Sequence, residues 1–265
     1  MKVEIIYGEL ANLLGEHGSQ KLLAQTFGED HLIRTFYPAL PAFLKGDVDL
    51  VYMGPMTERT QRLVLELWQG QASRFQKAIE GGTVFFFAGN ALDLLGRTIR
   101  YEGKETIEAL GLYPFDTFCR RYDRYNEVVC ASFKEMPVMG FRSQFTTHTG
   151  DAGAYPFLQV NYGSGMNPDT PSEGIHDRNF FATDLLGPFL ILNPSFTRWL
   201  FNLTGFRGPL PFEEEMTAAA AIRLTDFLET YSPKSKAYKL IHAYLRKENQ
   251  ILNPSARLKN ENTPR

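Results

Sequence analysis

The stretch VFFFAGNALDLLG, residues 84–96, decides the fold class. Its first part, residues 84–87, is wholly apolar, which is typical of a strand buried on both faces of a sheet. Gly89 and Asn90 follow where the apolar run ends, and residues 91–95 begin a helical pattern. The stretch therefore predicts a central strand that turns sharply into a helix.

Strand and helix patterns alternate in the segments before this stretch. Such alternation predicts parallel strands with helices on both faces of the sheet, which is an α/β fold. The expected strands are residues 3–7, 31–36 and 49–53, and the expected helices are residues 18–27 and 57–80.

The pattern changes after Asn126. Residues 127–131 and 138–141 are expected to be strands with no helix between them, and residues 146–155 are expected to be a loop. A further strand is expected at residues 179–183. The remaining patterns are helical, at residues 212–231 and 236–247.

Composition narrows the classes of function. Of the 265 residues, 43% are hydrophobic and 22% charged, and the formal net charge is −2. Such a balance argues against a nucleic-acid partner, which usually requires a basic surface. No apolar run approaches the roughly 20 residues that cross a bilayer. The apolar segment at the start of the chain is too short and too charged for a signal peptide. We therefore expect no membrane span and a cytoplasmic protein.

Cysteines and histidines predict no metal and no cofactor. Cys119 and Cys130 fit no metal-ligand spacing, and two cysteines make no disulfide framework in a chain of this length. His148 and His176 are expected to be solvated in loops. Metal ligands normally come in threes or fours, which the spacing of these residues does not suggest.

Four segments, taken in order, resemble one family. Residues 7–18 resemble the N-terminal signature of the CobB/CobQ-like class-I glutamine amidotransferases, and residues 49–54 resemble the strand before their oxyanion loop. Residues 87–96 resemble their nucleophile elbow, and residues 183–190 their histidine motif. The most similar branch is the glutaminase subunit of lipid II isoglutaminyl synthase. The resemblance implies a flavodoxin-like α/β fold with a mostly parallel sheet and helices on both faces.

That family's chemistry needs a thiolate on the elbow and a histidine to move the proton. The resemblance places Gly89 at the nucleophile position, or Ala88 or Asn90 if the alignment slips by one residue. It places Leu186 at the histidine position. Pro55, in the oxyanion loop, has no backbone N–H to donate. These departures predict a chain without glutaminase activity.

The function implied is that of a binding or scaffold subunit. Its expected partner is a Mur-ligase-like synthetase subunit of an amidating complex, because the resembled subunit works in such a pair. The vacated glutamine pocket would bind a different small molecule. Its expected lining is Gly54, Gly89, Asn90, Gln144 and Leu186.

Two alternatives stay open. The chain could be an enzyme of another kind that uses Asn90, Asp93, Gln144 or His148 in the same cleft. It could also be an active glutamine amidotransferase if the alignment of the elbow is wrong.

Three regions are expected along the chain. Residues 1–205 would form the amidotransferase-like domain, and residues 206–250 a C-terminal helical extension packed on it. Residues 251–265 are polar with Pro254 and Pro264, and we expect a disordered tail.

Overall fold

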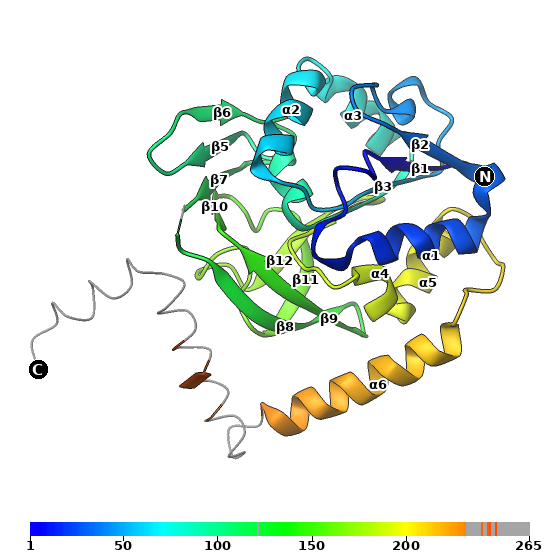
Figure 1. The fold of residues 1–265 in the computed structure, drawn as a ribbon, viewed down its shortest axis with the longest axis vertical. Coiled ribbons are helices and arrows are strands. Elements are labelled where there is room, and N and C mark those ends of the chain that lie inside the picture. Colours follow the sequence, from blue (N-terminus) through cyan, green and yellow to red (C-terminus); the bar gives the residue numbers. More distant parts are fainter. Residues whose placement is uncertain (121, 232–239, 241–242, 245–246, 248–265) are drawn as a thin grey trace, which may run out of the picture.

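The main layer of the protein is a large mixed β-sheet (Figure 1). The computed structural model describes residues 1–120 and 122–231, together with residues 240, 243, 244 and 247. Within these residues the strand order is β2-β1-β3-β4-β13-β12-β11-β8-β9. The strands are β1 (Val3–Ile6), β2 (Leu32–Thr35), β3 (Leu50–Met53), β4 (Val84–Ala88), β8 (Tyr125–Phe133), β9 (Met136–Gln144), β11 (Pro156–Tyr162), β12 (Ser172–Asp177) and β13 (Phe180–Thr183).

Parallel pairing covers one half of this sheet. Strands β2, β1, β3, β4 and β13 are parallel neighbours. The pairings of β13 with β12, β12 with β11, β11 with β8 and β8 with β9 are antiparallel. The change of sequence pattern after Asn126 marks the antiparallel half, because antiparallel strands need no crossover helix.

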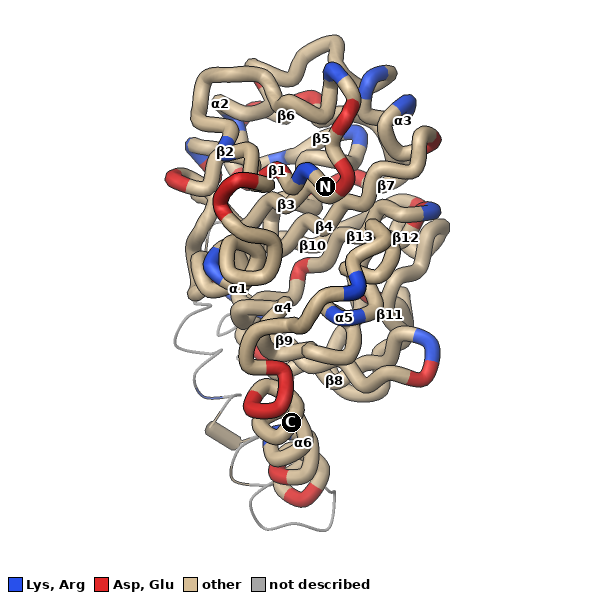
Figure 2. The backbone as a smooth tube through the Cα atoms, turned by 90° about the vertical axis from the view of Figure 1, so that its right-hand side faces the viewer, with Lys and Arg blue, Asp and Glu red and all other residues tan. Residues whose placement is uncertain are grey.

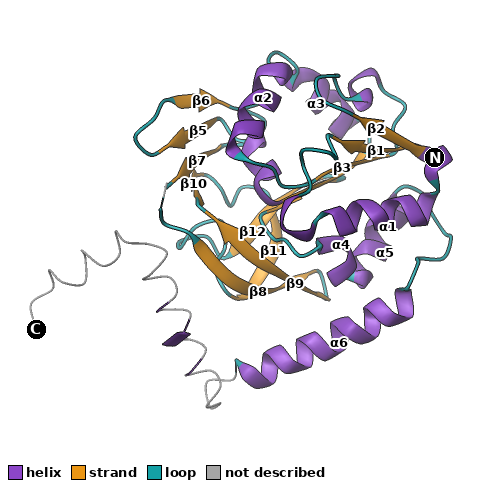
Figure 3. Cartoon of the chain, viewed as in Figure 1, coloured by secondary structure: helices purple, strands orange, loops and turns teal. Residues whose placement is uncertain are grey.

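Helices cover both faces of the sheet, which confirms the predicted α/β fold class (Figure 3). Phe86 of β4 points into a core shared with α1 (His17–Phe27), α4 (Phe189–Leu192) and α5 (Pro194–Leu203). Phe85 and Phe87 point into a core shared with α2 (Glu58–Trp68) and α3 (Ala72–Glu80). All residues of β4 are buried, because the strand lies between two packed faces.

A second, smaller sheet was not expected from the sequence. Its strand order is β10-β7-β5-β6, with β5 (Thr98–Tyr101), β6 (Thr106–Glu108), β7 (Phe115–Cys119) and β10 (Thr146–Gly150). The prediction of a loop over residues 146–155 was therefore wrong at β10. This strand pairs with β7 from Thr146 opposite Cys119 to Gly150 opposite Phe115, and tertiary pairing overrides its polar sequence.

Two helix predictions also differ from the structure. The helix expected over residues 57–80 is two helices, α2 and α3, separated at Gly70 with a φ of +73°. The helix expected to begin at residues 91–95 is the 3₁₀ helix η4 (Gly89–Leu95), and β5 begins two residues after Gly96. Further 3₁₀ helices are η1 (Leu13–Gly15), η2 (Glu29–His31) and η3 (Ala42–Lys45).

Helix α6 (Glu213–Thr230) lies along the antiparallel end of the large sheet (Figure 1). Phe227 packs with Cys130 and Met139, and Arg223 donates to the carbonyl of Leu192 at 2.9 Å. The helix expected at residues 236–247 and the tail expected at residues 251–265 lie, apart from the few residues named above, outside the described residues.

Charged residues of both signs are interspersed over the described chain (Figure 2). An example is Arg198 on α5, which pairs with Glu213 in the first turn of α6. Among the described residues, no helix is both long and apolar enough to cross a membrane.

Candidate functional site

The turn after β4 leaves no room for a side chain. Gly89 has a φ of +61°, a left-handed conformation that favours glycine. A Cβ atom at this position would lie 2.7 Å from Pro55 Cβ and 2.8 Å from Leu186 Cδ2. Carbon atoms attract best at roughly 3.5–4.0 Å and repel at such shorter distances. The turn therefore requires glycine on two independent grounds.

Backbone hydrogen bonds at Leu186 and at the residues that follow it fix the position of this leucine. It exchanges two backbone hydrogen bonds with Phe141, of 2.9 and 3.0 Å. Just beyond it, the N–H groups of Gly187 and Phe189 donate to Glu16 Oε1 at 2.9 and 2.8 Å. Burial raises the pKa of Glu16, whereas its hydrogen bonds lower it. The leucine side chain thus lies against Gly89 because the backbone around it is held.

Pro55 is held by the side chain of Asn90. The Asn90 amide donates to Met56 O at 2.7 Å and accepts from Met56 N at 2.8 Å. Gln61 Nε2 in turn donates to the carbonyl of Asn90 at 2.8 Å. Asn90 therefore fixes the loop that carries Pro55 against Gly89.

A cavity of about 260 Å³ opens beside this turn. Gly89, Asn90, Gln144 and Leu186 line it, so the structure brings together four of the five residues expected in the pocket. Gly54 is the exception and does not line the cavity. A Cβ there would lie 2.5 Å from the carbonyl oxygen of Ala11. The cavity is also lined by Asp184, Cys119, Arg124 and Thr146.

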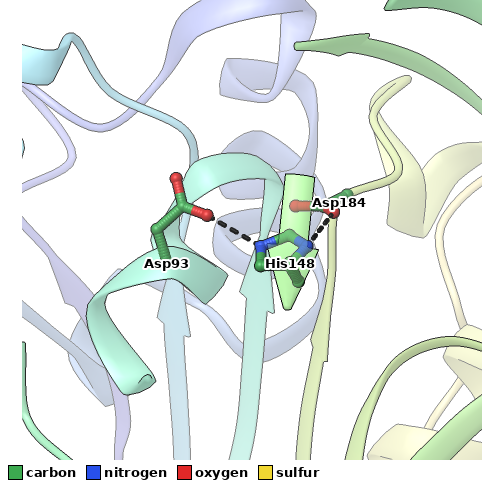
Figure 4. A group of neighbouring side chains, drawn as sticks. All are labelled: Asp93, His148 and Asp184. Atoms are coloured by element: carbon green, nitrogen blue, oxygen red, sulfur yellow. Dashed lines mark hydrogen bonds and ion pairs between the residues drawn. The ribbon is translucent and has the colours of Figure 1, made fainter. Parts of the chain in front are cut away.

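Three buried ionisable side chains lie close together (Figure 4), and one of them, Asp184, lines the cavity. His148 on β10 lies between Asp93 on η4 and Asp184, which follows β13. His148 Nε2 is 2.9 Å from Asp93 Oδ1, and His148 Nδ1 is 3.5 Å from Asp184 Oδ2. Both His148 and Asp93 are 0% exposed. The expectation of a solvated loop histidine at position 148 was wrong.

These partners oppose the effect of burial on the histidine. Burial lowers the pKa of His148, but the carboxylates of Asp184 and Asp93 raise it, and the net shift is upward. Burial raises the pKa of Asp184, and His148 opposes that shift. Each charge in the group is therefore stabilised mainly by the others.

Glu173 and Arg142 extend the buried group. Burial raises the pKa of Glu173 to about 7, and Arg142 opposes this shift. Arg142 Nη2 lies 3.8 Å from Glu173 Oε1, and Arg142 Nη1 donates to Glu127 at 3.1 Å. Glu173 also accepts the backbone N–H of Asp184 at 2.7 Å. This bond positions Asp184 at the cavity wall.

The alternative catalytic set divides between two environments. Asn90 and Gln144 line the cavity, and Gln144 Nε2 donates to Asp184 Oδ2 at 3.2 Å. Asp93 and His148 are close to them but fully buried. The second predicted loop histidine, His176, lies instead on β12 with Nε2 2.9 Å from the carbonyl of Arg178.

Neither cysteine lies on the turn after β4. Cys119 ends β7 and lines the cavity, and burial raises the pKa of its thiol to about 12. Among the described residues no hydrogen bond joins this thiol to an imidazole. Cys130 on β8 packs against Met139 and Phe227, and burial raises its pKa as well.

Sequence reasoning missed Asp184, Glu173, Arg142 and Glu16 as members of the site. A signal was present for two of them. Arg142 lies in the largely apolar strand β9, and Asp184 directly follows the apolar strand β13. A buried charge in such a segment requires a partner, and several of them together indicate a network. Glu173 lies in β12, Ser-Glu-Gly-Ile-His-Asp, which is not an apolar segment. Glu16 gave no comparable signal, because its neighbours are polar and small.

Comparisons with known proteins agree with the fold and the motifs. No protein-family model matches the chain. The lipid II isoglutaminyl synthase (glutamine-hydrolyzing) subunit GatD of Staphylococcus aureus is 27% identical over 168 residues, which cover 63% of this chain and 68% of that protein. The subunit of the same name from Streptococcus pneumoniae is 24% identical over 245 residues, covering 89% and 93%.

Solved structures support the fold alone at their low identity. The structure of PurLQS from Thermotoga maritima has a TM-score of 0.52 at 11% identity, covering 76% of this chain and 97% of that chain. A glutamine amidotransferase crystal structure has a TM-score of 0.50 at 13% identity, covering 78% and 100%. The chain therefore has the class-I glutamine amidotransferase fold and is similar in sequence to GatD subunits.

Proposed function

We propose that this protein does not hydrolyse glutamine and acts as a binding or scaffold subunit. The observation that carries the proposal is the contact at Gly89, where any side chain would meet Pro55 and Leu186 below 3 Å. This packing supports the proposal, because it leaves no room for a nucleophilic side chain at position 89, and the sequence supplies none there. The resemblance assigns the same turn to the catalytic cysteine of glutamine-hydrolysing relatives.

The reaction also lacks its proton carrier. Acyl transfer from an amide needs a base near the nucleophile to accept a proton and return it to the leaving ammonia. Leu186 stands where the resemblance places that base, and its side chain has no exchangeable proton. His148 does not replace it, because its Nε2 is engaged by Asp93 and its ring is fully buried.

The cavity beside the turn would then bind a small molecule without converting it. Its wall combines apolar Leu186 and Pro55 with the polar groups of Gln144, Asp184 and Arg124. This mixture is typical of ligand pockets, in which a few polar groups orient a mainly apolar contact surface.

The partner that fits the proposal is a Mur-ligase-like synthetase subunit. The similar curated proteins are subunits of a lipid II isoglutaminyl synthase, so the fold would be retained here for assembly. In this role the chain contributes surface and stability to the complex, and not ammonia.

A glutamine-hydrolysis assay tests the catalytic half of the proposal. The purified protein is incubated with glutamine, alone and with a Mur-ligase-like synthetase from the same source, and ammonia and glutamate are measured. The expected result is no release above the buffer blank. Release at an ordinary enzymatic turnover of about 1–10³ per second would overturn the proposal.

A complex-formation experiment tests the scaffold half. The chain and the synthetase are co-expressed and analysed by size-exclusion chromatography with light scattering. A stable complex that forms equally well without glutamine is expected. Two separate monomers at micromolar concentration would refute the scaffold role without restoring a catalytic one.

A further inference from the structure

Two buried polar atoms on one face of β10 have no hydrogen-bond partner. They are His148 Nδ1 and Thr146 Oγ1. Residues two apart in a strand point to the same face, so both side chains are directed to the side of Asp184. Buried polar atoms without a partner are rare and call for a reason, and a bound ion is one of the recognised reasons.

The distance between His148 Nδ1 and Asp184 Oδ2 fits a shared metal ion. The two atoms lie 3.5 Å apart, which is longer than the roughly 2.7–2.9 Å of a charge-assisted hydrogen bond. Two tetrahedral ligands at about 2.0–2.1 Å from Zn²⁺ are separated by about 3.4 Å. The observed gap is therefore close to the span of a metal-bridged pair.

Asp93 prepares the histidine for this role. Its Oδ1 lies 2.9 Å from His148 Nε2 and accepts the proton of that nitrogen. When the ring is neutral, the other nitrogen, Nδ1, carries a free electron pair on the side of Asp184. A ligating histidine almost always donates its second N–H to a carboxylate or carbonyl in this way, which fixes the ring and increases its basicity.

The local charge also favours a cation. Asp93, Asp184 and Glu173 contribute three buried carboxyl groups, whereas Arg142 is the basic group among them apart from His148. Arg142 is already bonded to Glu127 at 3.1 Å. Its guanidinium therefore compensates only part of the buried negative charge, and a divalent ion between His148 and Asp184 would compensate more.

We propose that His148 and Asp184 bind a divalent transition-metal ion. Nitrogen and carboxylate ligands favour Zn²⁺ among the common ions. Asp93 would act as a positioning residue behind the histidine, and Thr146 Oγ1 and water from the adjoining cavity would complete the coordination. The ion would join β10 of the small sheet to the end of β13 in the large sheet. This site does not depend on the proposed function.

A Zn²⁺ titration tests the site directly. The full-length protein is stripped with a chelator, dialysed and titrated with ZnCl₂ by isothermal calorimetry, and its thermal midpoint is measured with and without Zn²⁺. One Zn²⁺ per chain and a rise of the midpoint are expected. No saturable binding at micromolar Zn²⁺, or binding without any rise of the midpoint, would overturn the proposal.

Variants locate the ion and separate the site from a simple ion pair. His148→Gln and Asp184→Asn should abolish binding, and Asp93→Asn should weaken it by about 10–100-fold. His17→Gln, on an exposed residue of α1, should leave binding unchanged. If a variant does not fold, Co²⁺ titration of the wild type still decides, because tetrahedral nitrogen and oxygen ligands give visible absorption bands. Equal binding by the wild type and His148→Gln would contradict the assignment.

Discussion

Substituting Gly89 by alanine should destabilise the fold through two separable effects. The left-handed backbone at φ +61° costs a residue with a Cβ about 1–2 kcal/mol. The new methyl group would also lie 2.7 Å from Pro55 Cβ and 2.8 Å from Leu186 Cδ2, and such overpacking costs about 1–3 kcal/mol. Gly89→Ala should therefore lower the free energy of unfolding by about 2–5 kcal/mol.

Gly111 supplies a matched control for the backbone effect. Its φ is +67°, and a Cβ there would meet nothing within 4 Å. Gly111→Ala should lose only the conformational part, about 1–2 kcal/mol. Urea unfolding of both variants, compared at the same m value, gives the difference. Losses that agree within about 0.5 kcal/mol would refute the close packing around Gly89, whereas a smaller loss for Gly89→Ala in a Leu186→Ala background would support it.

Three further predictions concern buried ionisable groups. In chelator-treated protein, stability should fall as the pH rises from about 5 to 8. The pKa of Glu173 is raised from 4.5 to about 7 and that of His148 is raised above 6.5, so the folded state binds more protons than the unfolded chain over this window. A urea midpoint that is unchanged or higher at pH 8 would contradict this. Glu16→Ala should lower the free energy of unfolding by about 2–4 kcal/mol, because it leaves the N–H groups of Gly187 and Phe189 without their acceptor. The control Glu9→Ala, which removes one exposed acceptor, should lower it by less than about 1 kcal/mol. Equal losses of unfolding free energy in urea would show that Glu16 does not anchor these N–H groups. Cys119 should react with iodoacetamide far more slowly in the native protein at pH 7.5 than in urea. Burial raises the pKa of its thiol to about 12, and the thiolate is the reactive form. Equal alkylation rates for the native and the unfolded protein, measured by mass spectrometry, would refute this.

Local sequence was sufficient for the layers of the fold. The apolar run of β4 required burial on both faces, and Phe85 and Phe86 indeed point into different cores. The alternation of strand and helix patterns before it predicted the parallel half of the sheet, because parallel strands are connected by crossover segments. These features depend on periodicity within a few residues, which a single sequence displays.

The small sheet could not be predicted in the same way. Residues 146–150 read Thr-Thr-His-Thr-Gly and carry no apolar alternation. They become a strand because they form backbone hydrogen bonds with the edge of β7. Pairing between segments that are distant in the sequence produces no local pattern of apolar residues. The prediction of a loop histidine at position 148 failed for this reason, whereas His176 lies on β12 of the large sheet.

Four residues of the predicted pocket line one cavity, whereas their ligand-binding role stays a prediction. Gly89 and Asn90 follow β4 and Leu186 follows the neighbouring strand β13, while Gln144 ends β9 at the far edge of the sheet. The contact of Pro55 and Leu186 with Gly89 joins three distant segments, and so does the group around His148. Asp93 and His148, for example, lie 55 positions apart. Such contacts depend on the packed structure.

Covalent trapping tests the central claim most directly. The diazoketone analogue of glutamine alkylates a thiolate that can attack the glutamine side chain, and the chain has two cysteines, Cys119 and Cys130. Intact-mass spectrometry of the native protein after treatment should show no adduct. A stoichiometric adduct that forms at pH 7.5, is suppressed by glutamine and maps to Cys119 would show that a working nucleophile exists in the cavity after all.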